Sequence, residues 1–386
     1  MRTSSTRLIA VALALGLGAA VSANAATEKV LYSFKGGSDG AGPQAALIDV
    51  NGTFYGTTAI GGGTGCGGSG CGTVFSLTRK GKETVVYSFQ GGSDGAGPIA
   101  ALIDVNGTFY GTTANGGGMG FGTVFSVTPA GKETVVYSFQ GGSDGVNPFA
   151  HLTKVGDKFY GTTWSGGNYG SGTVYSLTPS GTETVLHSFG GYDEPGAYPS
   201  AGLIKFGSLL YGTTVDSVYF VTPSGVFNVV HTFAGGSSDG SYVYAGLTDV
   251  GSTLYGTTWE GGGTGCGGYG CGTVFWVTAA GGEGVLHSFS GGVGDGASPY
   301  AGVTKVDGTL YGTTWGGGVH NGGTMFEIDP ANGEEKILHS FGGGIDGAGP
   351  YAGLIGVDGT LYGTTEVGGA STNCGSGCGT VFSVTP

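Results

Sequence analysis

The tetrapeptide YGTT occurs seven times in this chain of 386 residues, and its spacing limits the possible folds more than any other feature. The copies begin at residues 55, 110, 160, 211, 255, 311 and 362, so consecutive copies are 44 to 56 residues apart. A repeat with a period near fifty residues predicts an architecture in which each unit packs against its neighbours along the chain.

Each unit contains four short segments with the composition of β-strands. In chain order they are exemplified by PYAGLIGV (350–357), LYGTT (361–365), GTVFSVTP (379–386) and TVVYSF (134–139). In several units an NG or DG pair separates the first two segments, which is typical of a type I′ turn between antiparallel strands. No segment has the spacing of an amphipathic helix. Four antiparallel strands in each of seven units predict an all-β fold, the seven-bladed β-propeller.

One repeat unit is divided between the two ends of the chain. The last third segment ends at residue 386, whereas a fourth segment without a unit of its own, KVLYSF, occupies residues 29–34. We expect 29–34 to pair with 379–385, so that the N-terminal strand completes the C-terminal blade and closes the ring. Residues 26–386 then form a single propeller domain. The alternative is a β-solenoid or open array, which has no reason to divide a unit in this way.

The 90 glycines and 12 prolines would indicate disorder in a chain without periodicity. Here aromatic and β-branched residues recur between them at fixed places. Phe recurs in the fourth segment, and Phe or Tyr recurs in the third, so these rings are expected to form the core. The glycine within YGTT is expected to leave room for a neighbouring ring.

Residues 1–25 have the pattern of a secretory signal peptide. The basic stretch MRTSSTR precedes the apolar stretch LIAVALALGLGAAV, and small residues precede a cleavage point after Ala25. Without Arg2 and Arg7 the chain has 11 basic and 26 acidic residues, a formal charge near −15. A surface of this sign repels phosphate groups, which disfavours nucleic acids and anionic membranes as partners. We expect an exported monomer, extracellular or periplasmic, with no segment inserted in a membrane.

Tandem units of the form LYGTT…GG…GTVF…TP.G…VLYSF.GG.DG..P resemble the bacterial GloVer (Gloeobacter/Verrucomicrobia) repeat proteins. The resemblance covers nearly the whole chain after residue 26, and it implies an extracellular location. It implies no particular activity, so no catalytic residues are carried over from it.

The order of strands assigns the connections to two faces of the disc. The short hairpins after the first and third segments must lie on one face. The glycine-rich loops after YGTT and the GGSDGAGP-type connections between units must lie on the other, called here the loop face. Most length variation occurs in the second group, so the loop face is the expected location of function.

The six cysteines form three closely spaced pairs in the glycine-rich loops of units one, five and seven. In an exported protein such pairs predict local disulfides, Cys66–Cys71, Cys266–Cys271 and Cys374–Cys378. A shared metal site would need ligands from three separate blades to converge, so no metal site and no cofactor are predicted. Free thiols are the remaining alternative.

An aspartate recurs in the connections between units, and an aspartate before glycine in a turn usually bonds to its own backbone. Because each connection offers one carboxylate, a cation site is the less favoured alternative. His187, His231, His287 and His339 occupy a fourth-segment position that is Tyr in other units, which indicates a structural role. The repeated aspartates are Asp39, Asp94, Asp144, Asp239, Asp295 and Asp346, with Asp193 or Glu194 in the irregular fourth unit.

Aromatic residues of the loop face are the candidate ligand contacts. The residue after YGTT is a tryptophan in three units, Trp164, Trp259 and Trp315. If the first strand is innermost, the residue after its proline, or the equivalent position, lies at the mouth of the central channel. Either these rings stack on sugars or they pack against the adjacent loops. The candidates at that second position are Phe149, Tyr244, Tyr300 and Tyr351, in register with Gln44, Ile99 and Ser200.

No recognised catalytic motif is present, and the glycine runs lie between strands instead of opening a helix as in a phosphate-binding loop. We therefore expect a non-catalytic binding protein that recognises a glycan or another surface macromolecule. One alternative is a structural component of the cell surface or matrix. The other is a polysaccharide lyase or hydrolase, which would need several residues that break the repeat to converge, namely His151, His320, Asp216, Glu260 and Glu366.

Overall fold

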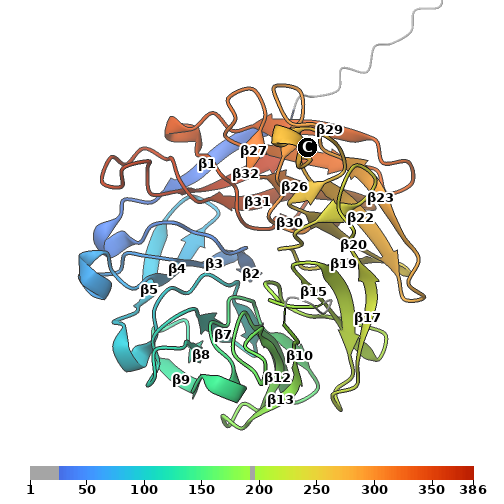
Figure 1. Cartoon of the computed structure of the whole chain (residues 1–386). Helices are drawn as coiled ribbons and strands as arrows, with labels where there is room; N and C mark the ends of the chain where they lie inside the picture. Colours follow the sequence, from blue (N-terminus) through green and yellow to red (C-terminus); the bar gives the residue numbers. More distant parts are fainter. Residues whose placement is uncertain (1–25, 192–195) are drawn as a thin grey trace, which may run out of the picture.

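In the computed structural model, the described residues 26–191 and 196–386 form a ring of seven four-stranded antiparallel sheets (Figure 1). The prediction of an all-β, seven-bladed propeller is confirmed. The expected signal peptide (1–25) and the acidic residues 193 and 194 lie outside the described residues. Within the described ranges no helix has the length and apolar character needed to cross a bilayer.

The blades are numbered by their YGTT copy, and their strands are given from the innermost to the outermost. Blade 1 contains β2 (Ile48–Val50), β3 (Thr53–Thr58), β4 (Thr73–Thr78) and β5 (Glu83–Ser88); blade 2 contains β6 (Ile103–Val105), β7 (Thr108–Thr113), β8 (Thr123–Val127) and β9 (Glu133–Ser138); blade 3 contains β10 (Thr153–Val155), β11 (Lys158–Thr163), β12 (Thr173–Leu177) and β13 (Glu183–Ser188). Blade 4 contains β14 (Ile204–Phe206), β15 (Leu209–Thr214), β16 (Ser217–Val221) and β17 (Phe227–Thr232); blade 5 contains β19 (Thr248–Val250), β20 (Thr253–Thr258), β22 (Thr273–Thr278) and β23 (Glu283–Ser288). Blade 6 contains β25 (Thr304–Val306), β26 (Thr309–Thr314), β28 (Thr324–Ile328) and β29 (Glu335–Ser340); blade 7 contains β30 (Ile355–Val357), β31 (Thr360–Thr365), β32 (Thr380–Thr385) and β1 (Thr27–Ser33).

Short elements on the loop face connect the blades. Two ribbons join a connection between blades to the glycine-rich loop that follows it, β18 (Gly240–Ser241) with β21 (Glu260–Gly261) and β24 (Gly296–Ala297) with β27 (Gly316–Gly317). Single 3-10 turns occur at η1 (Gly37–Asp39), η2 (Cys66–Gly68), η3 (Gly92–Asp94), η4 (Gly142–Asp144), η5 (Cys266–Gly268) and η6 (Gly344–Asp346).

The N-terminal strand β1 completes blade 7. It pairs antiparallel with β32, with Thr27 opposite Thr385 and Ser33 opposite Thr380. Figure 1 shows β1 beside β32, although the two strands come from opposite ends of the chain. The ring is therefore closed by backbone hydrogen bonds between the two ends of the described chain.

The first strands are shorter than the sequence predicted. In blade 7 only Ile355–Val357 pairs with β31, whereas the predicted strand was 350–357. Pro350 has no N–H to donate, and the carbonyl of Ala352 accepts a hydrogen bond from Thr313 Oγ1 of blade 6 instead of extending the ladder. The segments nearest the axis thus bond partly to the preceding blade.

The two threonines of YGTT make different hydrogen bonds. The first threonine donates its hydroxyl to an alanine carbonyl in the next blade, for example Thr57 to Ala100 at 3.2 Å and Thr213 to Ala245 at 2.8 Å. The same bond closes the ring from Thr364 to Ala45 at 3.3 Å. The second threonine bonds to a third-strand hydroxyl of its own blade; the pairs are Thr58–Thr73, Thr113–Thr123, Thr163–Thr173, Thr214–Ser217, Thr258–Thr273, Thr314–Thr324 and Thr365–Thr380.

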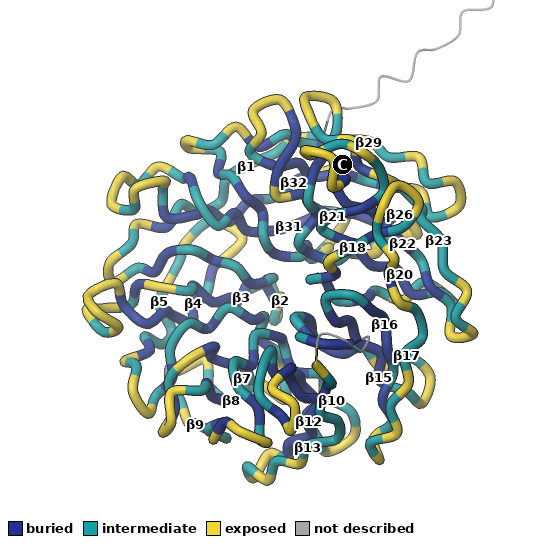
Figure 2. Tube along the Cα trace, in the orientation of Figure 1, coloured by how far each residue is buried: buried dark blue, intermediate teal, exposed yellow. Residues whose placement is uncertain are grey.

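Aromatic rings fill the space between consecutive blades, as predicted. The fourth-strand Phe of one blade packs edge-on against the third-strand ring of the next, with Phe34 and Phe75 at 5.0 Å between centroids. Both rings are fully buried. Figure 2 shows the sheets buried and the loop tips exposed. The equivalent pairs are Phe89–Phe125, Phe139–Tyr175, Phe189–Tyr219, Phe233–Phe275, Phe289–Phe326 and Phe341–Phe382.

Thr213→Val is expected to lower the free energy of unfolding by about 1–3 kcal/mol, because the side chain keeps its shape while the buried carbonyl of Ala245 loses its hydrogen bond from Thr213. Thr232→Val, at an exposed position of β17 in the same blade, is the control, with an expected change within about 0.5 kcal/mol. Equilibrium urea unfolding measures both. Equal effects of the two substitutions would contradict a structural role for the bond between blades.

Gly111→Ala should also destabilise the fold, by about 1–3 kcal/mol, because an added Cβ would lie 2.7 Å from the ring of Phe125 and 2.9 Å from Leu102. Gly263→Ala, at a position with open space around the added atom, should be close to neutral. Thermal unfolding measures the change in stability of both variants. An unchanged stability of Gly111→Ala would contradict this prediction, because it would show that Phe125 and Leu102 can move to admit the added Cβ.

Candidate functional site

The glycine-rich loops and the connections between blades lie together on one face, as strand order predicted. Gly62 of the first glycine-rich loop donates its N–H to the carbonyl of Gly37 in the preceding connection at 2.7 Å. The bridge between Ala41 and Ile60 joins the same two segments. The two ribbons join the corresponding segments at blades 5 and 6. The loop face is therefore a continuous hydrogen-bonded layer that can hold side chains in fixed positions.

A central cavity of about 300 Å³ lies at the axis of the ring. It is lined by the segments that precede the first strands, which are the innermost parts of the blades (Figure 1). All seven positions that the sequence placed at the channel mouth contribute to this lining, namely Gln44, Ile99, Phe149, Ser200, Tyr244, Tyr300 and Tyr351.

Five of the candidate aromatic residues form one contact group, called here the mouth cluster. Tyr244 and Tyr300 stack at 4.9 Å with their planes 5° apart, and Tyr351 lies 3.8 Å beyond Tyr300. Trp259 packs edge-on against Tyr300 at 5.4 Å and lies 5.9 Å from Trp315. Blades 5, 6 and 7 thus supply one continuous aromatic surface at one side of the mouth.

The mouth cluster is partly buried by its own contacts. Its three tyrosines and Trp259 are half-buried, whereas Trp315 is 46% exposed. The tyrosines therefore pack on one another, as one interpretation of the sequence proposed. Trp315 presents a ring to solvent, and stacking on a sugar stays a prediction for it.

The other two candidates form a separate group on blade 3. Phe149 lies 6.0 Å from Trp164, which lies 5.3 Å from Tyr198. No ring contact joins this group to the mouth cluster within the described residues. The seven aromatic candidates are thus brought together as five and two.

Acidic side chains border the mouth cluster. Glu366 accepts a hydrogen bond from Gln44 Nε2 at 2.8 Å, across the closure of the ring. Burial raises the pKa of Tyr351, and its hydrogen bond with Tyr300 and the charge of Glu366 raise that pKa further. Burial raises the pKa of Tyr244 too, and Glu260 adds to this effect. The hydroxyls therefore stay protonated, and the carboxylates give the mouth a negative charge.

The remaining unrepeated residues do not gather at one place. His151 lines the cavity, and burial lowers its pKa. Asp216 accepts hydrogen bonds from Gly196 N at 3.0 Å and Thr214 Oγ1 at 2.8 Å, so it stabilises a turn. His320 is exposed on a loop beside Gly342. Within the described ranges no hydrogen bond joins these residues into a catalytic arrangement.

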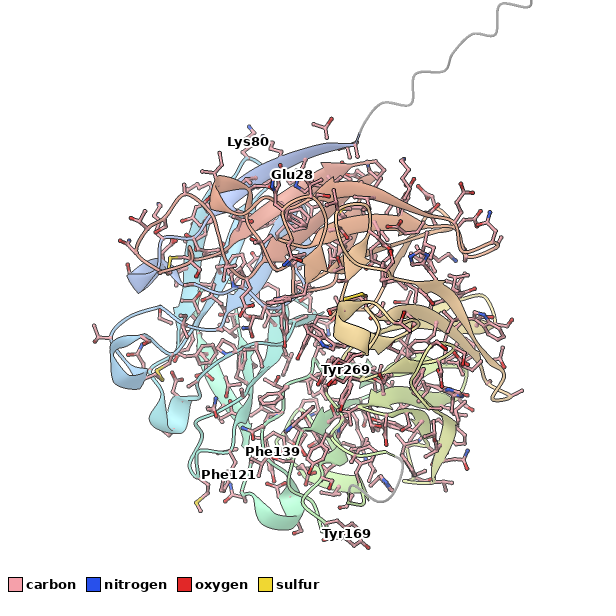
Figure 3. The ribbon with its side chains drawn as sticks, turned by 45° about the horizontal axis from the view of Figure 1, so that its top comes forward. Glu28, Lys80, Phe121, Phe139, Tyr169 and Tyr269 are labelled. Atoms are coloured by element: carbon pink, nitrogen blue, oxygen red, sulfur yellow. A yellow bond between two sulfur atoms is a disulfide. The ribbon has the colours of Figure 1, made fainter. Side chains whose placement is uncertain are left out.

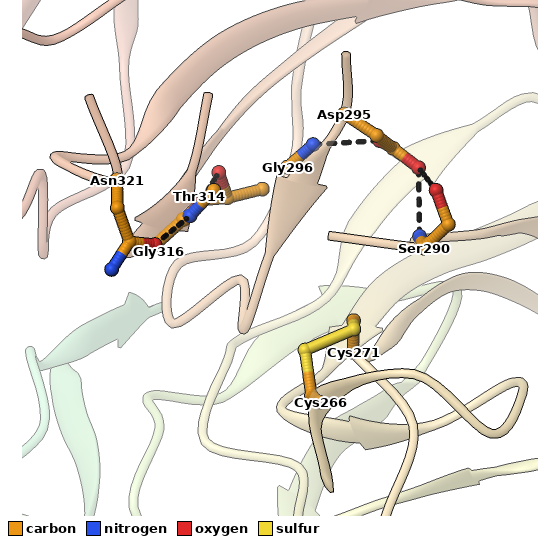
Figure 4. Close-up of a disulfide and its surroundings, with 9 residues drawn as sticks. Cys266, Cys271, Ser290, Asp295, Gly296, Thr314, Gly316 and Asn321 are labelled. Atoms are coloured by element: carbon orange, nitrogen blue, oxygen red, sulfur yellow. Dashed lines mark hydrogen bonds between the residues drawn. A yellow bond between two sulfur atoms is a disulfide. The ribbon is translucent and has the colours of Figure 1, made fainter. Parts of the chain in front are cut away.

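The three predicted disulfides are confirmed as Cys66–Cys71, Cys266–Cys271 and Cys374–Cys378, and the described chain has no free cysteine. Each disulfide closes one glycine-rich loop on itself, and the backbone carbonyl of its second cysteine accepts a hydrogen bond from the following connection. Figure 4 shows Cys266–Cys271 below the connection that contains Asp295, whose carboxylate accepts hydrogen bonds from Ser290 and Gly296.

The repeated aspartates have the structural role that the sequence favoured. Asp94 accepts hydrogen bonds from the backbone N–H of Gln90 at 2.6 Å and from the Tyr87 hydroxyl at 2.8 Å. In three units with histidine at that position the ring faces the aspartate instead, as in His339 and Asp346 at 3.1 Å. His187, in the fourth, stacks on Phe227. Except in that unit, the position alternating Tyr and His is therefore a polar contact with the connection.

Sequence analysis missed the glutamates that face these aspartates. They begin the fourth segment of most units, and this regular placement was the available signal. Burial raises the pKa of Glu133 to about 7, with a further contribution from the charge of Asp94 in the same junction. The six residues with this shift are Glu28, Glu83, Glu133, Glu183, Glu283 and Glu335.

A model of the Gloeobacter/Verrucomicrobia repeat matches residues 67–269 and 264–386. The chain belongs to the Gloeobacter/Verrucomicrobia repeat family. Among curated proteins none matches the sequence.

Solved structures of very different proteins have a similar fold. Virginiamycin B lyase from Staphylococcus aureus is 15% identical, with a TM-score of 0.59 over 94% of this chain and 99% of its own. Oligogalacturonate lyase from Vibrio parahaemolyticus is 10% identical, with a TM-score of 0.56 over 94% of each chain. The Pan2 WD40 domain of Neurospora crassa is 11% identical, with a TM-score of 0.56 over 93% of this chain and 95% of its own. At these identities the likeness shows the propeller fold alone.

The raised pKa of Glu133 predicts a pH dependence of stability. The folded state holds this proton more tightly than the unfolded chain, so the contribution of Glu133 to stability is fully present below its ordinary pKa of 4.5 and is lost as the pH rises through about 7. Glu133→Gln should weaken this pH dependence. The melting temperature of the variant minus that of wild type should be higher at pH 8 than below pH 4.5, by roughly 1–3 °C after allowance for solvent screening. Glu334→Gln on an exposed turn is the control. If the melting temperatures of wild type and Glu133→Gln changed equally with pH, the raised pKa of Glu133 would be contradicted.

Proposed function

We propose that this protein is exported and binds a glycan at the mouth cluster without catalysing a reaction. The observation that supports this most directly is the continuous aromatic surface of Tyr244, Trp259, Tyr300, Trp315 and Tyr351 beside Glu366. Such a surface occurs on one side of the mouth, where blades 5, 6 and 7 meet.

The chemistry of the mouth cluster suits a sugar. A pyranose ring presents apolar C–H groups on its faces, which pack on an aromatic ring, and hydroxyls at its edge, which hydrogen-bond to carboxylates and amides. Trp315 supplies the exposed ring, and the hydrogen-bonded pair Gln44–Glu366 supplies polar atoms at the same opening. The stacked tyrosines form a rigid support that loses little conformational entropy on binding.

Export is supported by two independent features. The N-terminal sequence has the pattern of a secretory signal, and three disulfides staple the loops of the loop face. Disulfides of this kind persist in oxidising compartments. A glycan of the cell surface or the surrounding medium is the ligand class available there.

A structural role at the surface is the second candidate, and exposed apolar loop tips favour it. Tyr169, Tyr269, Val293 and Ile345 are 69–74% exposed, each on a loop at a different place around the ring. Figure 3 labels Tyr169 and Tyr269 on their loops. Self-association through these tips would be visible by sedimentation, and a monomer at high concentration would count against this role.

A glycan array probed with the mature chain, followed by calorimetry with the best ligand, tests the proposal. Trp315→Ala should raise the Kd about tenfold, because a single aromatic contact in a binding surface commonly contributes more than 1 kcal/mol. Tyr269→Ala, which removes an exposed ring from a blade 5 loop away from the cluster contacts, should leave the Kd unchanged.

No binding across the array, or equal loss in both variants, would contradict the proposal. Incubation of each bound oligosaccharide with the protein covers the enzymatic alternative. The appearance of shortened or unsaturated products would show a lyase or hydrolase, like the lyases that have the same fold.

A further inference from the structure

We propose that three junctions between blades, at the outer edge of the ring, each bind a divalent transition ion of the zinc type. Each junction brings together a histidine from the outer strand of one blade, an aspartate from the following connection and a glutamate from the outer strand of the next blade. This inference is independent of the glycan proposal, since the junctions lie at the outer strands and the mouth cluster lies at the axis.

The ligand atoms in each junction already lie within 4.8 Å of one another. The junctions are consecutive, between blades 4 and 5, 5 and 6, and 6 and 7. Figure 3 labels Glu28, on β1, in the last of them. The three sets are His231, Asp239 and Glu283; His287, Asp295 and Glu335; and His339, Asp346 and Glu28.

The distances from the histidine Nε2 atoms to the carboxylate oxygens are close to those between two ligands of a tetrahedral ion. With metal–ligand bonds of about 2.0–2.2 Å, two ligands of Zn²⁺ are about 3.3 Å apart. His231 Nε2 lies 3.8 Å from Asp239 and 3.9 Å from Glu283, and His287 Nε2 lies 3.9 Å from Asp295. His339 Nε2 lies 3.1 Å from Asp346. Side-chain shifts of under 1 Å would therefore give the coordination geometry.

Several of these ligand atoms have no hydrogen-bond partner within the described part of the chain. They are enclosed by protein, and they include both an imidazole nitrogen and a carboxylate oxygen in two of the junctions. An enclosed polar atom without a partner lowers stability, and a bound cation would satisfy all three side chains together. The atoms are His231 Nε2, His287 Nε2 and Oε1 of Glu28, Glu283 and Glu335.

In three other junctions the aspartate is satisfied without an ion, although Oε1 of the glutamate there (Glu83, Glu133 or Glu183) also has no hydrogen-bond partner within the described residues. There a tyrosine occupies the histidine position, and its hydroxyl donates a hydrogen bond directly to the aspartate. Tyr32, Tyr87 and Tyr137 make this bond at 2.7–2.9 Å. Histidine is shorter, and in His231 and His287 its nitrogen stops 3.8–3.9 Å from the aspartate, beyond hydrogen-bond reach.

The donor set indicates the class of ion. One imidazole with two carboxylates suits Zn²⁺ and neighbouring transition ions, with water in the remaining position. Calcium prefers six to eight oxygen ligands, which this junction does not offer. The side chains of His231, Asp239 and Glu283 are 15–20% exposed, so an ion and its water can enter from solvent.

The third site would also strengthen the closure of the ring. Glu28 belongs to β1, whereas His339 and Asp346 belong to blade 6 and its connection. A bound ion would fasten the N-terminal strand to a second blade, in addition to its pairing with β32.

The test uses the mature full chain, freed of metal by a chelator and titrated with zinc chloride by calorimetry. Wild type should bind up to three ions and show a higher melting temperature with zinc. The triple variant His231→Tyr, His287→Tyr and His339→Tyr places at these junctions the residue found at three others, those of Tyr32, Tyr87 and Tyr137, so it should fold and should lose at least about tenfold in zinc affinity.

His187→Tyr is the matched control. His187 occupies the same strand position, but Phe227 stands where the glutamate would be and stacks on the imidazole at 3.8 Å. This variant should bind zinc as wild type does. If the triple variant does not fold, the three single variants decide, since each should reduce the stoichiometry by one ion.

Absence of zinc binding by wild type would overturn the proposal, as would triple or single variants that bind as wild type does. Equal stabilisation by calcium chloride, unchanged by the tyrosine substitutions, would also overturn it, because it would show a site made of carboxylates alone.

Discussion

The hydrogen bond from the first threonine of YGTT to an alanine carbonyl of the next blade holds the inner ring of the propeller together. It is buried and occurs at each of the seven blade junctions, including the one between Thr364 and Ala45 where the chain closes. Because the alanine directly follows the channel-mouth residue, this bond fixes where the side chain at that position stands. The geometry of the mouth thus depends on a scaffold contact that repeats without change.

Both proposed sites lie on the part of the disc that blades 4 to 7 form. Blades 5 to 7 supply the aromatic surface at the axis, and the junctions from blade 4 to blade 7 carry histidine at the outer edge. Tyrosine takes the outer position in blades 1 and 2 and on β1 of blade 7. A seven-fold scaffold leaves such positions free to vary, because the shape depends on the threonines, glycines and phenylalanines that do not vary.

Much of the candidate mouth was predictable from the sequence, since strand order alone placed Tyr244, Tyr300 and Tyr351 at one radius and on one face. Their stacking was not predictable, because it depends on the angle between neighbouring blades. The junctions were missed for a related reason. Within the sequence each connection contains one recurring carboxylate. The second carboxylate of a junction comes from the outer strand of the next blade, as Glu283 does, more than forty residues after Asp239.

The sequence by itself determined the number of blades, the strands in each, the buried rings and the local disulfides, because these follow from short-range periodicity and from residues close together in the chain. Only the tertiary structure decided the length of the innermost strands, which side chains meet at the mouth and which charged groups share a junction. Those features depend on contacts between blades. The repeat pattern predicts which residues each blade contains, but it does not predict the distance between two blades.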